Sequence, residues 1–122
     1  MPTVADVRAL LGDLDPSYVS DETIQKHIDE AANYVGQFVS SSHPLYEQAV
    51  LYRATYLTLL TYSEVARREV GDLPANVSVL LEHFRQLADE TLAAARASQI
   101  STTYTPIALT RSWYDETESG DP

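Results

Sequence analysis

The stretch that decides the fold is residues 45–62, which read LYEQAVLYRATYLTLLTY. Only Glu47 and Arg53 are charged within it, and apolar or aromatic residues fall on nearly every side of a helix. A helix that is apolar all round must be buried on most of its sides. We therefore expect a long, central helix that starts at Pro44, a favoured first position, and ends near Glu69.

Two shorter amphipathic helices are expected before this central one. The first spans residues 4–11, where Thr3 can cap the start and Asp6 stands three positions later, as in a capping box. The second opens at Ser20, and its apolar residues recur at helical spacing through Phe38 and Val39, before three serines end the element. Both present one apolar face to the central helix.

A fourth helix is expected over residues 76–97, after the loop Gly-Asp-Leu-Pro at residues 71–74. Its predicted inner stripe consists of apolar or small residues at helical spacing: Val79, Leu80, Phe84, Leu87, Ala88, Thr91, Leu92 and Ala95.

The composition changes after Ala97. Residues 98–122 are rich in Ser, Thr and Tyr and end in an acidic run, and Pro106 interrupts two segments with strand-like preferences. We expect an extended C-terminal arm over residues 98–122, with a flexible acidic end. The predicted fold is therefore all-α: a four-helix, bundle-like domain over residues 1–97, with a long buried third helix and this arm.

The charge balance excludes several classes of partner. The chain of 122 residues has 18 acidic and 8 basic residues, a formal net charge of −10, and Lys26 is the single lysine. A basic patch for nucleic acid phosphates is missing, and an anionic membrane surface would repel the chain. No apolar stretch is long enough for a membrane span. A halophilic host and a GC-rich genome that favours arginine codons both explain this composition.

No residue pattern predicts an enzyme. The chain lacks cysteine and has four glycines, and the common nucleotide-binding, serine-hydrolase and zinc-protease motifs are absent. His27, His43 and His83 lack the Glu-x-x-His spacing of metal sites in helical bundles, so we expect surface or core-edge histidines. Neighbouring carboxylates are typical of a solvated helix face. We predict no catalytic residue, metal or cofactor.

The aromatic residues indicate where the chain could bind a partner. Four of the eight tyrosines crowd the central helix, where core packing and an interface role explain them equally well. Aromatic and apolar residues in the otherwise polar arm suit docking into a partner's groove. The candidate partner-binding residues are Tyr104, Ile107, Leu109, Trp113 and Tyr114.

The layout resembles the head–tail connector (adaptor, or head-completion) proteins of long-tailed double-stranded DNA phages and related viruses. The resemblance lies in a short first helix, TVADVRALL at residues 3–11, and a second, DETIQKHIDEAANYV at residues 21–35. A long helix containing alanine and tyrosine follows, here residues 49–62, and then a fourth helix and a C-terminal arm.

This resemblance implies a structural virion protein at the head–tail junction, made in the host cytoplasm. About twelve copies would form a closed ring below the portal protein. The arm would reach the portal, and the opposite face would receive the next connector or tail-completion protein. DNA would pass through the lumen without specific binding, because acidic walls repel it.

Two rival functions share the small size and the negative charge. One is a DNA mimic that inhibits a DNA-binding protein, and the other is a regulatory helical binding module. Both predict a monomer or a dimer, so the mass of the particle in solution discriminates them from a ring-forming subunit.

Overall fold

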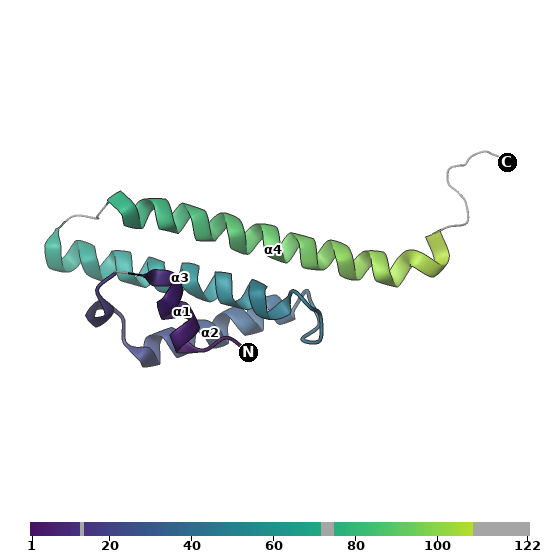
Figure 1. The fold of residues 1–122 in the computed structure, drawn as a ribbon, viewed down its shortest axis with the longest axis horizontal. Coiled ribbons are helices and arrows are strands. Elements are labelled where there is room, and N and C mark those ends of the chain that lie inside the picture. Colours follow the sequence, from purple (N-terminus) through teal and green to yellow (C-terminus); the bar gives the residue numbers. More distant parts are fainter. Residues whose placement is uncertain (13, 72–74, 109–122) are drawn as a thin grey trace.

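The computed structural model describes residues 1–12, 14–71 and 75–108. These residues form four α-helices and one short 3-10 helix, and they contain no strand, so the predicted all-α class is confirmed. Figure 1 shows the elements in order: α1 (Val4–Leu11), η1 (Pro16–Tyr18), α2 (Asp21–Gly36), α3 (Tyr46–Val70) and α4 (Ala75–Ala108).

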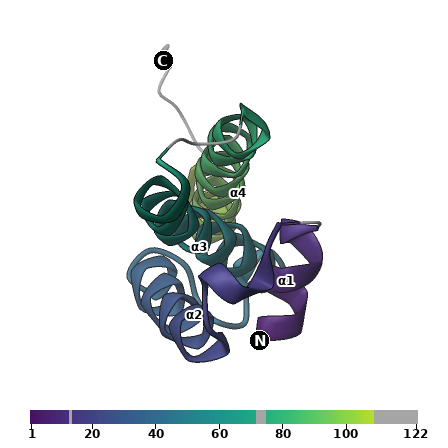
Figure 2. The same ribbon diagram turned by 90° about the vertical axis from the view of Figure 1, so that its left-hand side faces the viewer.

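Helix α3 is central, as its shortage of charge predicts. Figure 2 shows α4 on one side of it and α1 and α2 on the other, and α3 contacts all three helices and η1. Its buried side chains consequently point in almost every direction around its axis. They are Tyr46, Ala49, Val50, Ala54, Thr55, Thr58, Leu59, Tyr62, Ser63 and Ala66.

The polar side chains buried in α3 find acceptors within the helix itself. The hydroxyls of Thr55 and Thr58 each donate to a carbonyl four residues earlier, at 2.8 Å in both cases, and Ser63 donates to the carbonyl of Leu60 at 2.9 Å. A buried hydroxyl without a partner would be costly, so these local bonds allow three polar residues in the core.

The starts of α1 and α2 follow the predicted capping, whereas α3 begins at Tyr46 and not at Pro44 as predicted. Thr3 and Asp6 form the reciprocal capping box of α1, and the Ser20 side chain accepts from the backbone N–H of Thr23 at the start of α2. Helix α2 ends at Gly36, earlier than its apolar pattern suggests, and Val39 reaches the core from the turn that follows.

The predicted inner stripe of α4 is wrong at its first position. Val79 is 68% exposed, whereas Val77 is fully buried. Val77 precedes Phe84 by seven residues, two full turns, and so shares its face of the helix. Val79 precedes Phe84 by five residues and points to a different side. Phe84 itself and the later core positions Ala88, Leu92 and Ala95 are buried as predicted.

The predicted boundary at Ala97 is also wrong, because α4 continues without a break to Ala108. Residues 98–108 are therefore helical rather than extended. Adding a residue to an existing helix costs little compared with starting one, and the alanine-rich stretch before residue 98 supplies that helix. Pro106, which was expected to interrupt strands, falls in the last turn of α4. Because proline has no N–H, it removes one helical hydrogen bond, and the helix ends two residues later. Residues 109–122 lie outside the described residues.

Candidate interaction surfaces

The predicted partner-binding residues fall into two groups. Tyr104 and Ile107 are positions on the last third of α4. Leu109, Trp113 and Tyr114 lie outside the described residues. Because the backbone is helical to Ala108, positions 100, 104 and 107 share one helix face by their spacing of four and three residues.

The end of α4 projects beyond the body of the domain. Ala95 is the last described side chain that is buried, and the helix runs on to Ala108, a further distance of about 20 Å at about 1.5 Å per residue. Figure 1 shows this part of α4 extending past the end of α3, with no other helix alongside. The backbone of this end of α4 therefore lies beyond the other helices of the domain.

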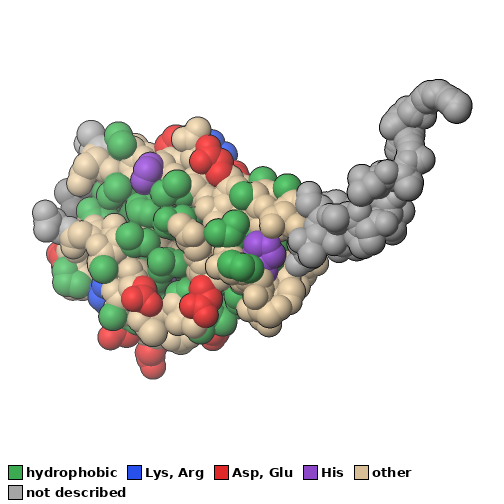
Figure 3. Space-filling view, turned by 45° about the vertical axis from the view of Figure 1, so that its right-hand side comes forward, with side chains coloured by type: hydrophobic (Ala, Val, Ile, Leu, Met, Phe, Trp, Pro, Cys, Tyr) green, Lys and Arg blue, Asp and Glu red, His purple; other side chains and the backbone are tan. Residues whose placement is uncertain are grey.

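One flank of the α3–α4 pair carries an apolar surface on the side where α1 lies. Leu80 and Leu87 of α4 are half-buried on either side of Phe84, whose ring lies 6.2 Å from that of Tyr52 on α3. We call Tyr52, Leu80 and Leu87 the front surface. Figure 3 shows apolar side chains gathered on the body, with carboxylates around them.

A different surface occupies the opposite flank, between α2 and α4. The guanidinium of Arg53 lies 4.2 Å from the ring centre of Tyr34 and 3.3 Å from a carboxylate oxygen of Asp89. Leu60 follows Arg53 by seven residues and so shares its side of α3, and Leu60 and Tyr34 are 38% and 40% exposed. We call Tyr34, Arg53, Leu60 and Arg85 the back surface.

The charges of the back surface are arranged around Arg85. Its guanidinium is hydrogen-bonded to the carboxylate of Glu82 and lies 3.3 Å from a carboxylate oxygen of Asp89. The hydrogen bond from Arg85 lowers the pKa of Glu82, and the same bond raises the pKa of Arg85. Exposed ion pairs of this kind add little stability, but they hold the guanidinium in place on the surface.

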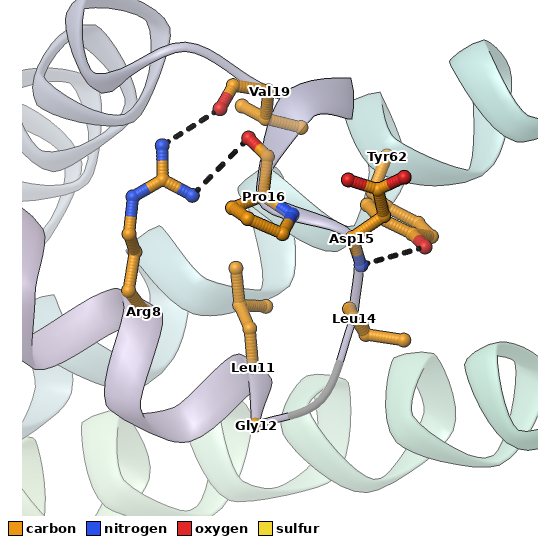
Figure 4. Close-up of a pocket in the computed structure, with 8 residues that line it drawn as sticks. All are labelled: Arg8, Leu11, Gly12, Leu14, Asp15, Pro16, Val19 and Tyr62. Atoms are coloured by element: carbon orange, nitrogen blue, oxygen red, sulfur yellow. Dashed lines mark hydrogen bonds between the residues drawn. The ribbon is translucent and has the colours of Figure 1, made fainter.

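A pocket of about 140 Å³ lies where α1 and η1 meet α3 (Figure 4). The guanidinium of Arg8 closes one side: it donates to the Asp21 carboxylate at 2.9 and 2.7 Å and to the Val19 carbonyl at 2.8 Å. On another side the hydroxyl of Tyr62 accepts from the backbone N–H of Asp15 at 3.3 Å. The remaining lining is Leu11, Gly12, Leu14 and Pro16.

This pocket is a joint rather than a candidate active site. Ligand pockets usually exceed about 300 Å³. The guanidinium N–H groups of Arg8 already form short hydrogen bonds with the Val19 carbonyl and the Asp21 carboxylate. The contacts fix α1 and the following turn against α2 and α3. Sequence reasoning did not find this arrangement, because no local pattern signals that Arg8 reaches Asp21, thirteen positions away.

The three histidines lie apart. His27 on α2 lies 2.8 Å from both a carboxylate oxygen of Glu30 and the hydroxyl of Thr61 on α3. The Nδ1 atom of His43 accepts from a backbone N–H in the loop before α3, and His83 is exposed on α4. Among the described residues, no three His, Cys, Asp or Glu side chains gather as a metal ion would require.

The described helices were also compared with the requirements of a membrane span. None of them combines the necessary length with sufficient apolar character.

Comparison of the chain with protein-family models, with curated proteins and with solved structures finds no match in any of the three.

Proposed function

We propose that this chain is a structural virion subunit that assembles into a ring between the portal and the tail, through which DNA passes. The observation that carries the proposal is the projecting end of α4. A helix that continues past Ala95, the last buried residue among the described side chains, suits the attachment of one ring to another. The order of the helices and the residue types in each of them resemble those of head–tail connectors, and this resemblance supports the same function.

The helical state of residues 98–108 makes such an attachment less costly than an extended arm would. Ordering a flexible segment costs about 1–2 kcal/mol per residue in backbone entropy. A segment that is already helical in the free subunit has lost most of this backbone entropy before it binds the portal. Many copies on one ring then act together, because each bound arm raises the effective concentration of the next.

The acidity of the chain supports the passage of DNA. A net charge of −10 on each subunit, repeated around a ring, would give the lumen a negative potential. Such walls repel phosphates and let DNA slide. The next connector or tail-completion protein would bind the ring face away from the portal.

The proposed role is structural, with no catalytic residue, metal or cofactor. The sequence has none of the common catalytic motifs. The pocket beside Arg8 is small, and its lining residues hold helices together. Purified protein should therefore show neither hydrolase nor transferase activity.

Two truncations test the attachment. Ending the chain after Ala97 removes the projecting helix, whereas ending it after Ala108 removes only residues 109–122. We expect the first protein to keep the melting temperature of its body but to fail to join portal-containing heads. Normal docking by the chain that ends at Ala97 would refute the proposed attachment, and the second truncation measures what residues 109–122 add.

Point substitutions locate the binding face on the projecting helix. Tyr104 and Thr102 are two positions apart and so lie on nearly opposite faces of α4. We expect Tyr104→Ala to weaken docking to heads and Thr102→Ala to leave it unchanged. Equal effects of the two substitutions would show that no single face of this helix binds the portal.

The DNA-mimic alternative requires an uninterrupted row of exposed carboxylates. The outer face of α2 carries Glu22 and Asp29, but Lys26 stands between them on the same face. This lysine interrupts the negative row, which counts against a DNA mimic. Native mass spectrometry discriminates the two functions, because a mimic remains a monomer or dimer at concentrations where a ring subunit forms larger closed particles.

A further inference from the structure

We infer that the pocket between α1, η1 and α3 is a binding site for a small neutral molecule that has an apolar body the size of one ring and one acceptor oxygen. The inference goes beyond the proposed function, which needs no such ligand, and it concerns binding alone. It rests on the size of the pocket, its apolar walls, its spare hydrogen-bond donors and the carboxylates around it (Figure 4).

The size of the pocket limits the ligand to a single ring. Its volume is about 140 Å³. An apolar cavity of about 150 Å³ can hold one benzene molecule, whereas drug-sized ligands occupy pockets of at least about 300 Å³. The pocket therefore excludes larger ligands but has room for a molecule about as large as benzene.

The walls of the pocket are mostly apolar. Side chains from α1 and the segment that follows it line the pocket: Leu11, Leu14, Pro16 and Val19. The ring of Tyr62, which is only 6% exposed, forms the wall on the side of α3. An apolar ring that is buried against these side chains leaves water, and this transfer favours binding.

Two polar groups at the pocket have hydrogen atoms to spare. Figure 4 shows Arg8 on one side of the pocket and Tyr62 on another. The Tyr62 hydroxyl accepts from the backbone N–H of Asp15 at 3.3 Å, but it donates to no acceptor within the described part of the chain. The Nη1 atom of Arg8 lies 3.5 Å from the Pro16 carbonyl, which is too long for a strong hydrogen bond. Because a buried donor without an acceptor is costly, a ligand oxygen that accepts from Tyr62 would stabilise the complex.

The charges around the pocket favour a neutral ligand. Asp15 lines the pocket, and Asp21 forms an ion pair with the guanidinium of Arg8. One arginine therefore faces two carboxylates, so a ligand carboxylate would meet a net negative charge. A cation is excluded for a different reason, because Tyr62 and Arg8 offer hydrogen-bond donors and not acceptors. The ligand class is therefore a small ketone or ester with an apolar body.

Cyclohexanone is the test probe, because it combines one apolar ring with one acceptor oxygen. Cyclohexane has the ring alone, and cyclohexanecarboxylate adds a negative charge. Each compound is titrated into the isotope-labelled protein, and the amide chemical shifts are followed by NMR. We expect saturable shifts for cyclohexanone near Arg8, Val19 and Tyr62, weaker binding of cyclohexane, and the weakest binding of the carboxylate.

Two tyrosine variants test the role of the hydroxyl. Tyr62→Phe removes the donor but keeps the ring, so it should weaken cyclohexanone binding about threefold to tenfold and leave cyclohexane binding unchanged. Tyr18→Phe is the matched control, because the Tyr18 ring lies 5.1 Å from that of Tyr62 but does not line the pocket. We expect Tyr18→Phe to bind both compounds as the wild type does.

Several results would overturn the inference. If cyclohexanone gives no saturable shifts, or shifts spread over the whole domain, the pocket is not a binding site. Equal binding of cyclohexanone and cyclohexane by the wild type would overturn the ligand class, and this comparison needs no variant to fold. Tighter binding of the carboxylate would overturn it as well. None of these results bears on the ring, which native mass spectrometry measures separately.

Discussion

Replacing Leu59 with alanine tests the central position of α3. The Leu59 side chain is completely buried on α3, the helix that contacts all three others. The substitution removes its terminal carbons from water-excluded packing and leaves a cavity that the rigid bundle fills only in part. For fully buried leucines this costs about 3–5 kcal/mol. A domain of this size has a total stability of about 5–15 kcal/mol, so the loss should be a large fraction of it.

Leu57 provides a matched control on the same helix. It is half-buried, so the same substitution removes less apolar area and leaves an opening that solvent can fill. We expect Leu57→Ala to cost about 1–2 kcal/mol. The two substitutions are chemically identical and two residues apart, so helix propensity cancels in the comparison.

Urea denaturation followed by far-UV circular dichroism measures both free energies of unfolding. The slope of free energy against urea should stay constant, so that the change appears in the midpoint. A cost below about 1 kcal/mol for Leu59→Ala would refute the central position of α3. So would a larger loss for Leu57→Ala than for Leu59→Ala, since that result would mean the helix is rotated from its described orientation.

Three further predictions concern the joint beside α1 and the charge of the chain. Arg8→Met keeps the apolar stem but removes the bonds to Asp21 and Val19, and should lower the free energy of unfolding by about 1 kcal/mol, since Asp21 is exposed. The backbone and side chain of Ser17 lower the pKa of Asp15, so Ser17→Ala should raise that pKa in an NMR titration. A lowered carboxyl pKa stabilises the fold above the ordinary pKa and stops doing so in acid, so the melting temperatures of wild type and Ser17→Ala should converge as the pH falls. Because the net charge is −10, the melting temperature should rise between low and molar salt, and a scanning-calorimetry trace that is flat or falls would contradict self-repulsion.

The sequence predicts the helices well where burial alone determines them. Residues 45–62 have almost no charge, and a chain with one core can bury such a helix only at its centre. The capping residues Thr3 and Ser20 likewise identify helix starts from local chemistry. These features need no knowledge of distant contacts, which explains why the order of helices could be read directly.

Errors arise where two local signals compete. Val77 and Val79 are equally apolar, and only the phase relative to Phe84 decides which of them is buried. The threonines and Pro106 after residue 100 favour extended structure, yet they follow a helix that is already formed. Intrinsic propensity is a weak prior beside helix propagation. The contact of Arg8 with Asp21 depends on tertiary packing and carries no local signal.

The helical state of residues 98–108 changes how the proposed portal contact must work. An extended arm could add to the edge of a partner's sheet, because its backbone N–H and C=O groups would be free to pair. In α4 those groups bond to one another along the helix, so the backbone has little to offer a sheet edge. Recognition must then come from one helix face lying in a groove, with positions four and three residues apart as anchors. Positions 100, 104 and 107 have this spacing and are Ile, Tyr and Ile. The complementary groove on the portal would then be apolar.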